Sequence, residues 1–300
     1  ILFDGTHDSR VTPALGNVTL NISSEDHGQI TFQGSFTDGS LGTVGDINNN
    51  HTGRFLTKQG SQYNNNGDQL NLVFDTDTII RDFGVKGEDD NGKYRPVGQG
   101  GAIYHYIESG INSALPISGS GNVTFYNNTA LGGSALNNRT DSNGLGGAIS
   151  GQNVYLQGSG TYTFDSNKAI GGDALVEMLV VAGHGGAINA SSVYLSGDGD
   201  YVFRNNLAEV GDNTGARDSN WNGQGGGIWV GAEGKFTGSG NILFEGNTAR
   251  TGSVTGQNTS IADSGGGGAL YGDRFASYTF DKSGQVVFKD NQAFGGDSSD

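Results

Sequence analysis

The chain has 300 residues, with 55 glycines, 3 prolines, no cysteine and a formal net charge of -15. The glycines follow no strict triplet, which excludes a collagen-like helix, and the missing cysteines exclude a disulfide framework or a thiolate metal site. The Lys and Arg residues are scattered, which argues against nucleic acid as a partner, and no apolar run approaches the roughly 20 residues that span a bilayer.

Residues 1–99 predict short strands, because patches of alternating Phe, Tyr, Val, Ile and Leu are bounded by Gly, Asn, Asp and Ser. Two of these patches, around Phe32 and Phe74, are weak copies of a motif that recurs later in the chain. A solenoid needs a covered end, so we expect residues 1–99 to form degenerate N-terminal coils or a cap. The chain begins at Ile1 without a signal segment, so we also expect it to be processed or cut from a longer parent.

Residues 100–300 carry two alternating motifs with a period of about 40 residues. The first motif reads Gly-x-apolar-x-Phe-x-x-Asn-x-Ala, and its central pairs are Phe125 with Asn128, Phe164 with Asn167, Phe203 with Asn206, Phe244 with Asn247, and Phe288 with Asn291. The second motif is Gly-Gly-Ala followed by Ile or Leu, at Gly101 and Ala102, Gly147 and Ala148, Gly186 and Ala187, Gly226 (before Gly227), and Gly268 and Ala269. We expect these residues to be scaffold.

The repeat predicts an all-β fold, a right-handed parallel β-helix in which like side chains stack on successive coils. Each phenylalanine is predicted to face inward, and each motif asparagine to form a turn in the left-handed region while its amide bonds the next coil. The paired glycines are expected to allow positive φ and a close approach of backbones. With two motifs per period we expect two coils per repeat, roughly 14 coils and a rod on the order of 65 Å long.

The alternation of Gly-Gly-Ala-Ile/Leu with Phe-x-x-Asn resembles the passenger repeats of the chlamydial polymorphic outer-membrane proteins, over roughly residues 100–293. The resemblance implies an autotransporter passenger, carried to the cell surface by a C-terminal β-barrel and used for adhesion to host cells. The chain departs from that family in having no cysteine, and it contains no such barrel.

Four irregular stretches follow the Phe-x-x-Asn motif at the same phase of the repeat, at residues 131–145, 170–184, 209–224 and 250–265. We expect them to emerge on one side of the rod and to form a common binding surface. The candidate binding residues in these loops are Asn138, Asp141, Asp218, Trp221 and Asn258. The apolar segment within 170–184 is expected to pack against the rod, with contact to another subunit as the alternative.

Catalysis and metal binding receive little support from the residue pattern. No acids and bases recur in phase, so we expect no catalytic residue and no enzyme activity. No cofactor is expected, and none of the five histidines has metal-ligand spacing; calcium stays open through the acidic turns at 88–92, 198–200 and 297–300.

The predicted function is that of a surface adhesin, on the outer membrane or secreted, that binds a receptor protein or glycan of a host or neighbouring cell through the in-phase loops. One alternative is a structural subunit of an extracellular fibre, formed by self-association of coils through unpaired edge strands. A polysaccharide-acting β-helix enzyme is the third.

Overall fold

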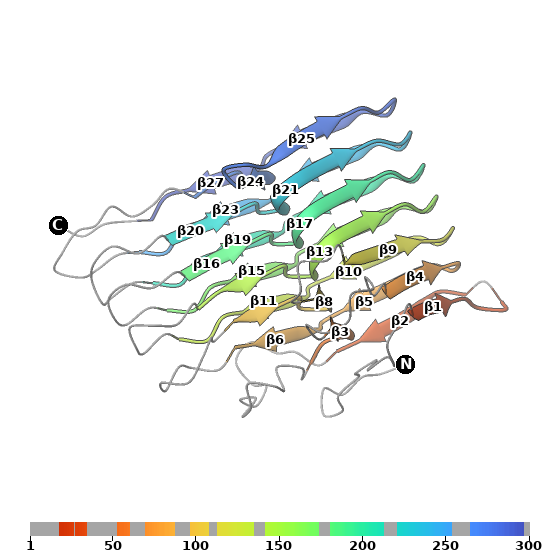
Figure 1. Ribbon diagram of the computed structural model, residues 1–300, viewed down its shortest axis with the longest axis horizontal. Coiled ribbons are helices and arrows are strands. Elements are labelled where there is room, and N and C mark those ends of the chain that lie inside the picture. Colours follow the sequence, from red (N-terminus) through yellow and green to blue (C-terminus); the bar gives the residue numbers. More distant parts are fainter. Residues whose placement is uncertain are drawn as a thin grey trace.

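The computed structural model describes residues 18–26, 28–34, 53–60, 70–87, 97–107, 113–134, 142–173, 181–212, 221–253 and 265–296. These ranges contain no helix, and every strand pairing within them is parallel. The strands stack into four sheets. Figure 1 shows the coils following one another along the stack, from the N-terminal strands (red) to the C-terminal strands (blue). The predicted fold class, an all-β parallel β-helix, is therefore confirmed.

Sheets 1 and 2 form the two broad faces of the solenoid. Sheet 1 has ten strands: β1 (Val18–Ile22), β3 (Leu56–Gly60), β4 (Leu70–Phe74), β8 (Ile103–Ile107), β9 (Ala114–Ser118), β13 (Ile149–Leu156), β17 (Ile188–Leu195), β21 (Ile228–Phe236), β24 (Leu270–Gly272) and β25 (Ser277–Phe280). Sheet 2 has seven: β2 (Ile30–Gln33), β5 (Thr78–Arg81), β10 (Val123–Tyr126), β14 (Tyr162–Asp165), β18 (Tyr201–Arg204), β22 (Ile242–Glu245) and β26 (Val286–Lys289).

Sheets 3 and 4 are made of shorter strands and lie at one end of each coil. Sheet 3 has six strands: β6 (Gly84–Lys86), β11 (Thr129–Leu131), β15 (Lys168–Ile170), β19 (Leu207–Glu209), β23 (Thr248–Arg250) and β27 (Gln292–Phe294). Sheet 4 has four: β7 (Gly98–Gln99), β12 (Gly144–Leu145), β16 (Val181–His184) and β20 (Trp221–Gln224).

One coil takes up one whole repeat, so the prediction of two coils per repeat was wrong. The chain passes from β13 through β14, β15 and β16, one strand in each sheet, before β17 pairs with β13. Phe125 accordingly lies beside Phe164, and Ile149 beside Ile188. The two motifs are different corners of the same coil. Seven stacked strands at a spacing of about 4.8 Å give a described stack of about 29 Å, not the 65 Å expected.

The core lies between sheets 1 and 2 and consists of stacked like side chains. The rings of Phe125, Phe164, Phe203, Phe244 and Phe288 form one column with centroids 4.9 to 5.1 Å apart. Facing them, Ile103, Ile149, Ile188 and Ile228 are fully buried on sheet 1. Buried apolar area of this kind stabilises the fold coil by coil, because each side chain contacts mainly its neighbours in the adjacent coils.

The first described coils depart from the repeat at the Gly-Gly-Ala corner. Register places Arg54 and Phe55 opposite Gly101 and Ala102, since Leu56 pairs with Ile103. Phe55 is buried against Phe32, with ring centroids 4.6 Å apart. Strands from residues 18 to 86 join the same sheets as the later strands, and the division of the chain at residue 99 stays a prediction.

Candidate binding edge

A buried column of asparagines forms the corner between sheets 2 and 3. Asn128, Asn167, Asn206 and Asn247 are completely buried. Each Nδ2 donates to Oδ1 of the next asparagine in the column, at distances of 3.0, 3.0, 2.9 and 2.8 Å up to Asn291. The Oδ1 that accepts this bond also accepts the backbone N–H of the same donor asparagine, which lies one coil earlier in the chain. Every buried amide in this column therefore has partners in two neighbouring coils.

The left-handed residue at this corner is not the motif asparagine, so that part of the turn prediction was wrong. Positive φ occurs one residue earlier, at Asn127 (51°), Ser166 (60°), Asn205 (55°), Gly246 (63°) and Asp290 (53°). These residues point outward, where short polar side chains tolerate the left-handed region. The asparagine that follows is turned inward, and its amide bonds the coils above and below.

Sheets 3 and 4 pack together through glycines with almost no side chain between them. A Cβ added to Gly183 would lie 2.6 Å from the backbone carbon of Glu209, and one added to Gly223 would lie 2.6 Å from that of Arg250. Gly98 and Gly144 have the same relation to Leu131 and Ile170. We call this two-layered part of each coil the glycine wing. Each of these glycines lies two residues before a Gly-Gly pair, so the full corner motif is Gly-x-Gly-Gly-Ala. The first glycine of this longer motif recurs in the sequence and could have been found there.

The Gly-Gly-Ala corner joins the glycine wing to sheet 1, and its two glycines have different tasks. The first glycine has positive φ, with values of 56° to 66° at Gly100, Gly146, Gly185, Gly225 and Gly267. The second lies against the start of a sheet 3 strand, so a Cβ on Gly101 would be 2.6 Å from the Thr129 backbone nitrogen. Ala102, Ala148 and Ala187 then turn into the core and are fully buried.

All four irregular stretches leave and re-enter the described structure at the free end of the glycine wing. They leave from Leu131, Ile170, Glu209 and Arg250, which occupy one register position in sheet 3. The first three re-enter sheet 4 before Gly144, Gly183 and Gly223, which also share one register position. We call this side of the molecule the loop edge; it lies where β15 and β19 end and where β16 and β20 begin (Figure 1).

Hydrogen bonds between coils hold the ends of these loops. Asp173 accepts the backbone N–H of Asp212 at 3.0 Å, and Asp212 accepts that of Ser253 at 2.9 Å. On the returning side, Asn143 accepts the N–H of Ala182 at 2.8 Å. These bonds place successive loop ends one coil apart, a spacing of about 4.8 Å.

The predicted binding residues themselves are described only in part. Asn138, Asp141, Asp218 and Asn258 lie outside the described residues, and so does most of the apolar segment within 170–184. Trp221 is the first residue of β20 and pairs with Val181, but its side chain is not among those described. Their role in binding stays a prediction.

His184, which follows one of these loops, lies on the outer side of sheet 4 against Trp229. The two rings are parallel within 5°, with centroids 4.9 Å apart. The Trp229 Nε1–H donates to Oε1 of Gln224 at 3.2 Å. Burial lowers the pKa of His184 to about 4, while the negative charge of Asp273 acts in the opposite direction. The imidazole is therefore neutral at pH 7.

We expect acid to destabilise the protein partly through His184. Its pKa is lower in the folded chain than the ordinary 6.5, so the unfolded chain takes up the proton more readily. The neutral His184 imidazole therefore makes its full contribution to the stability of the folded chain above about pH 6.5, and this contribution is lost as the pH falls toward 4. Urea unfolding at pH 7 and pH 4.5 should show a smaller loss of stability for His184→Gln than for the wild type. An equal loss in both proteins would contradict the assignment.

Two further observations concern metals and membranes. Among the described residues, no group of three or more His, Cys, Asp or Glu side chains could hold a metal ion. At the acidic turn 198–200, Asp198 accepts from Ser239, and Asp200 accepts the backbone N–H of Asn241. The other two acidic turns lie outside the described residues, and calcium binding there stays a prediction. In the described part of the chain no helix is long and apolar enough to cross a bilayer.

Comparison with known proteins gives one match. The model of the Chlamydia polymorphic membrane protein repeat matches residues 241–273. This segment runs from β22, which carries Phe244, through the corner at Asn247 to the Gly-Gly-Ala corner at Gly268, and so contains both motifs of one coil. No curated protein and no solved structure matches the chain.

Proposed function

We propose that the chain is an autotransporter passenger displayed on the bacterial surface, because residues 241–273 match the repeat of the Chlamydia polymorphic membrane proteins. In this proposal the passenger is an adhesin, and its loop edge binds a receptor on a host or neighbouring cell. The observation that supports the proposal is the shared register of the described loop ends, which lie on one side of the rod at Leu131, Ile170, Glu209 and Arg250. Loops held by a rigid scaffold are common binding elements.

The composition of the loop edge suggests the kind of receptor surface. The stretches 131–145, 170–184, 209–224 and 250–265 contain seven acidic and three basic residues. Opposite charges on two partners speed their encounter and disfavour wrong partners. We therefore propose that the receptor presents a basic surface, and that its binding weakens as salt concentration rises.

The test is binding of the whole chain to cultured epithelial cells, measured by flow cytometry over a concentration series. Wild-type chain should bind saturably, and replacing 135–141 and 213–220 with short Gly-Ser linkers should weaken binding at least tenfold. The matched control replaces 61–69, which connects β3 and β4, two strands of sheet 1 rather than of the loop edge. Unchanged binding after both loop replacements, or equal loss in the control, would rule out the loop edge.

A fibre subunit is the second candidate function. In this alternative, coils of separate copies stack end to end through unpaired edge strands. Sedimentation velocity would show large assemblies if this is the function, and a single monomeric boundary at high concentration would exclude it.

A further inference from the structure

The outer face of sheet 2 is bordered by short turns on both sides. Over the described strands β5 to β26, each strand of this sheet is entered and left through a short turn, as at 196–200 before β18 and at 205–206 after it. Other sides of the molecule carry longer insertions, such as 61–69 in sheet 1 and the irregular stretches of the loop edge. From β5 onward, the chain therefore adds no insertion at the borders of sheet 2.

The middle of this face is a row of aliphatic and threonine side chains. Residues alternate between the two sides of a strand, so Val202 and Arg204 point outward on either side of the buried Phe203. The parallel register repeats this arrangement on every coil. The middle row consists of Ile79, Thr124, Thr163, Val202, Leu243 and Val287. Val202 and Leu243 are only half-buried, so a partner that covered them would remove apolar area from water.

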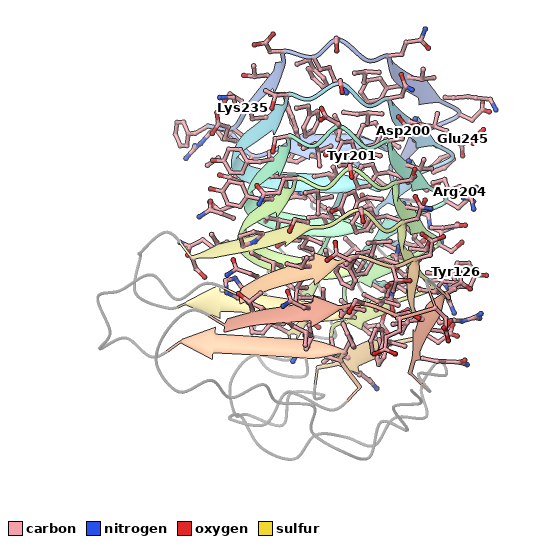
Figure 2. The ribbon with its side chains drawn as sticks, turned by 90° about the vertical axis from the view of Figure 1, so that its right-hand side faces the viewer. Tyr126, Asp200, Tyr201, Arg204, Lys235 and Glu245 are labelled. Atoms are coloured by element: carbon pink, nitrogen blue, oxygen red, sulfur yellow. The ribbon has the colours of Figure 1, made fainter. Side chains whose placement is uncertain are left out.

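The row beside it, at the end of the strands, alternates in charge. It reads Asp165, Arg204, Glu245 and Lys289 on four successive coils. Within the chain, Arg204 pairs with Asp165 at 2.8 Å, and Lys289 pairs with Glu245. The Arg204 side chain is still 48% exposed, so this pairing leaves it accessible. Figure 2 shows Arg204 and Glu245 one above the other on one side of the molecule, opposite Lys235.

An alternating row of this kind is complementary to a reversed copy of itself. Reading the row backwards exchanges acids and bases, so a second copy with its solenoid axis reversed presents a base wherever the first has an acid. A twofold axis that runs along the strands, between Arg204 and Glu245, places Arg204 opposite Glu245 of the second copy and Asp165 opposite its Lys289. If the axis instead passes through one strand, like charges face each other, as with Arg204 on Arg204, and such contacts are unfavourable.

We infer that two copies of this chain pair face to face through sheet 2, with their solenoid axes antiparallel. Val202 lies opposite Leu243 of the second copy in this pair, so an apolar middle is bordered by charged residues, an arrangement common in protein interfaces. The charges fix the register more than they add affinity, because each is already paired within its own chain. The pair closes on itself, unlike the end-to-end stacking of a fibre.

The size of the contact predicts weak association. Four strands of each copy face each other in this register: β14, β18, β22 and β26. With about 4.8 Å between strands and about 3.3 Å between residues, they cover roughly a few hundred Å² per copy. Stable complexes bury roughly 800 Å² per partner. We therefore expect a dissociation constant on the order of 100 µM.

The test is sedimentation equilibrium of the whole chain over a concentration series from about 10 to about 500 µM, in which the wild type should shift from monomer toward dimer. Arg204→Glu and Glu245→Arg should each weaken pairing at least tenfold, because like charges then face each other across the twofold axis. An equimolar mixture of these two variants should pair again, since the introduced acid faces the introduced base. The matched control is Lys235→Glu, the same change of charge on sheet 1, which should pair like the wild type.

Several outcomes overturn the inference. A wild type that stays monomeric over the whole series excludes the pair, and a mixture that pairs no better than either variant alone excludes the antiparallel register. Assemblies that grow beyond the dimer indicate end-to-end stacking instead. Leu243→Gln leaves the charged row intact and should weaken pairing about fivefold, so undiminished pairing would exclude sheet 2 as the contact. A thermal unfolding curve checks that each variant is folded. The variant with both loops replaced should pair like the wild type, which separates this contact from the loop edge.

Discussion

Replacing Asn206 with leucine is expected to lower the free energy of unfolding by about 4 kcal/mol. Asn206 Oδ1 accepts both the backbone N–H and the Nδ2–H of Asn167, and its own Nδ2 donates to the carbonyl of Phe164. Leucine leaves these buried groups without partners. An unsatisfied buried polar group costs about 1 to 3 kcal/mol.

The matched control is Asn205→Gly, one residue earlier. Asn205 has a φ of 55°, which glycine adopts without strain, and its amide reaches Asp165 only at 3.4 Å. We expect this variant to differ from the wild type by less than about 1 kcal/mol. Urea unfolding followed by circular dichroism compares the two. If Asn206→Leu destabilises no more than Asn205→Gly, the asparagine column contributes little to stability.

Adding one methyl group to the glycine wing should be nearly as damaging. In Gly223→Ala the new Cβ would overlap the backbone of Arg250, which cannot move aside as a side chain could. We expect a loss of about 3 kcal/mol in the free energy of unfolding. Sheets 3 and 4 should also separate locally, so that limited proteolysis cuts faster at the loop edge.

Gly151→Ala is the control for this second prediction. An added Cβ there would meet Val154 at 3.2 Å and the carbonyl of His105 at 3.4 Å, and Ala190 occupies the same register position one coil later. Gly151 also lacks the positive φ of the corner glycines. Its replacement should change stability by less than about 1 kcal/mol. Similar losses in the two variants would mean that close packing between sheets 3 and 4 is not the cause.

The predictable part of the fold is the part that repeats. The Phe column, the buried alanines and the glycine corners all follow from residues that recur with one period, because stacking of identical coils demands the same residue at the same place. The number of coils per period could not be derived from the repeating residues. Two motifs in one period fit two coils with one corner each, or one coil with two different corners. Only the pairing of Phe125 with Phe164 and of Ile149 with Ile188 decides between them.

The candidate site was predictable in position but not in detail. The phase of the irregular stretches indicated one common edge, and the described ends of these stretches do share register positions in sheets 3 and 4. A second row of insertions interrupts sheet 1, between β3 and β4, between β8 and β9, and at Phe275 between β24 and β25, and it follows neither motif. Trp229 and Tyr271 follow neither motif, and only the register places them in one row on the outer side of sheet 1.

By itself, the sequence determined that this protein is a stack of parallel coils with an inward phenylalanine and a glycine corner, because these choices are local and repeat in every coil. The tertiary structure alone decided that Asn206 faces the interior while Asn205 takes the left-handed turn, and that Gly223 touches Arg250. Such contacts join residues far apart in the chain. Their partners are set by the path of the coil as a whole, which no local pattern records.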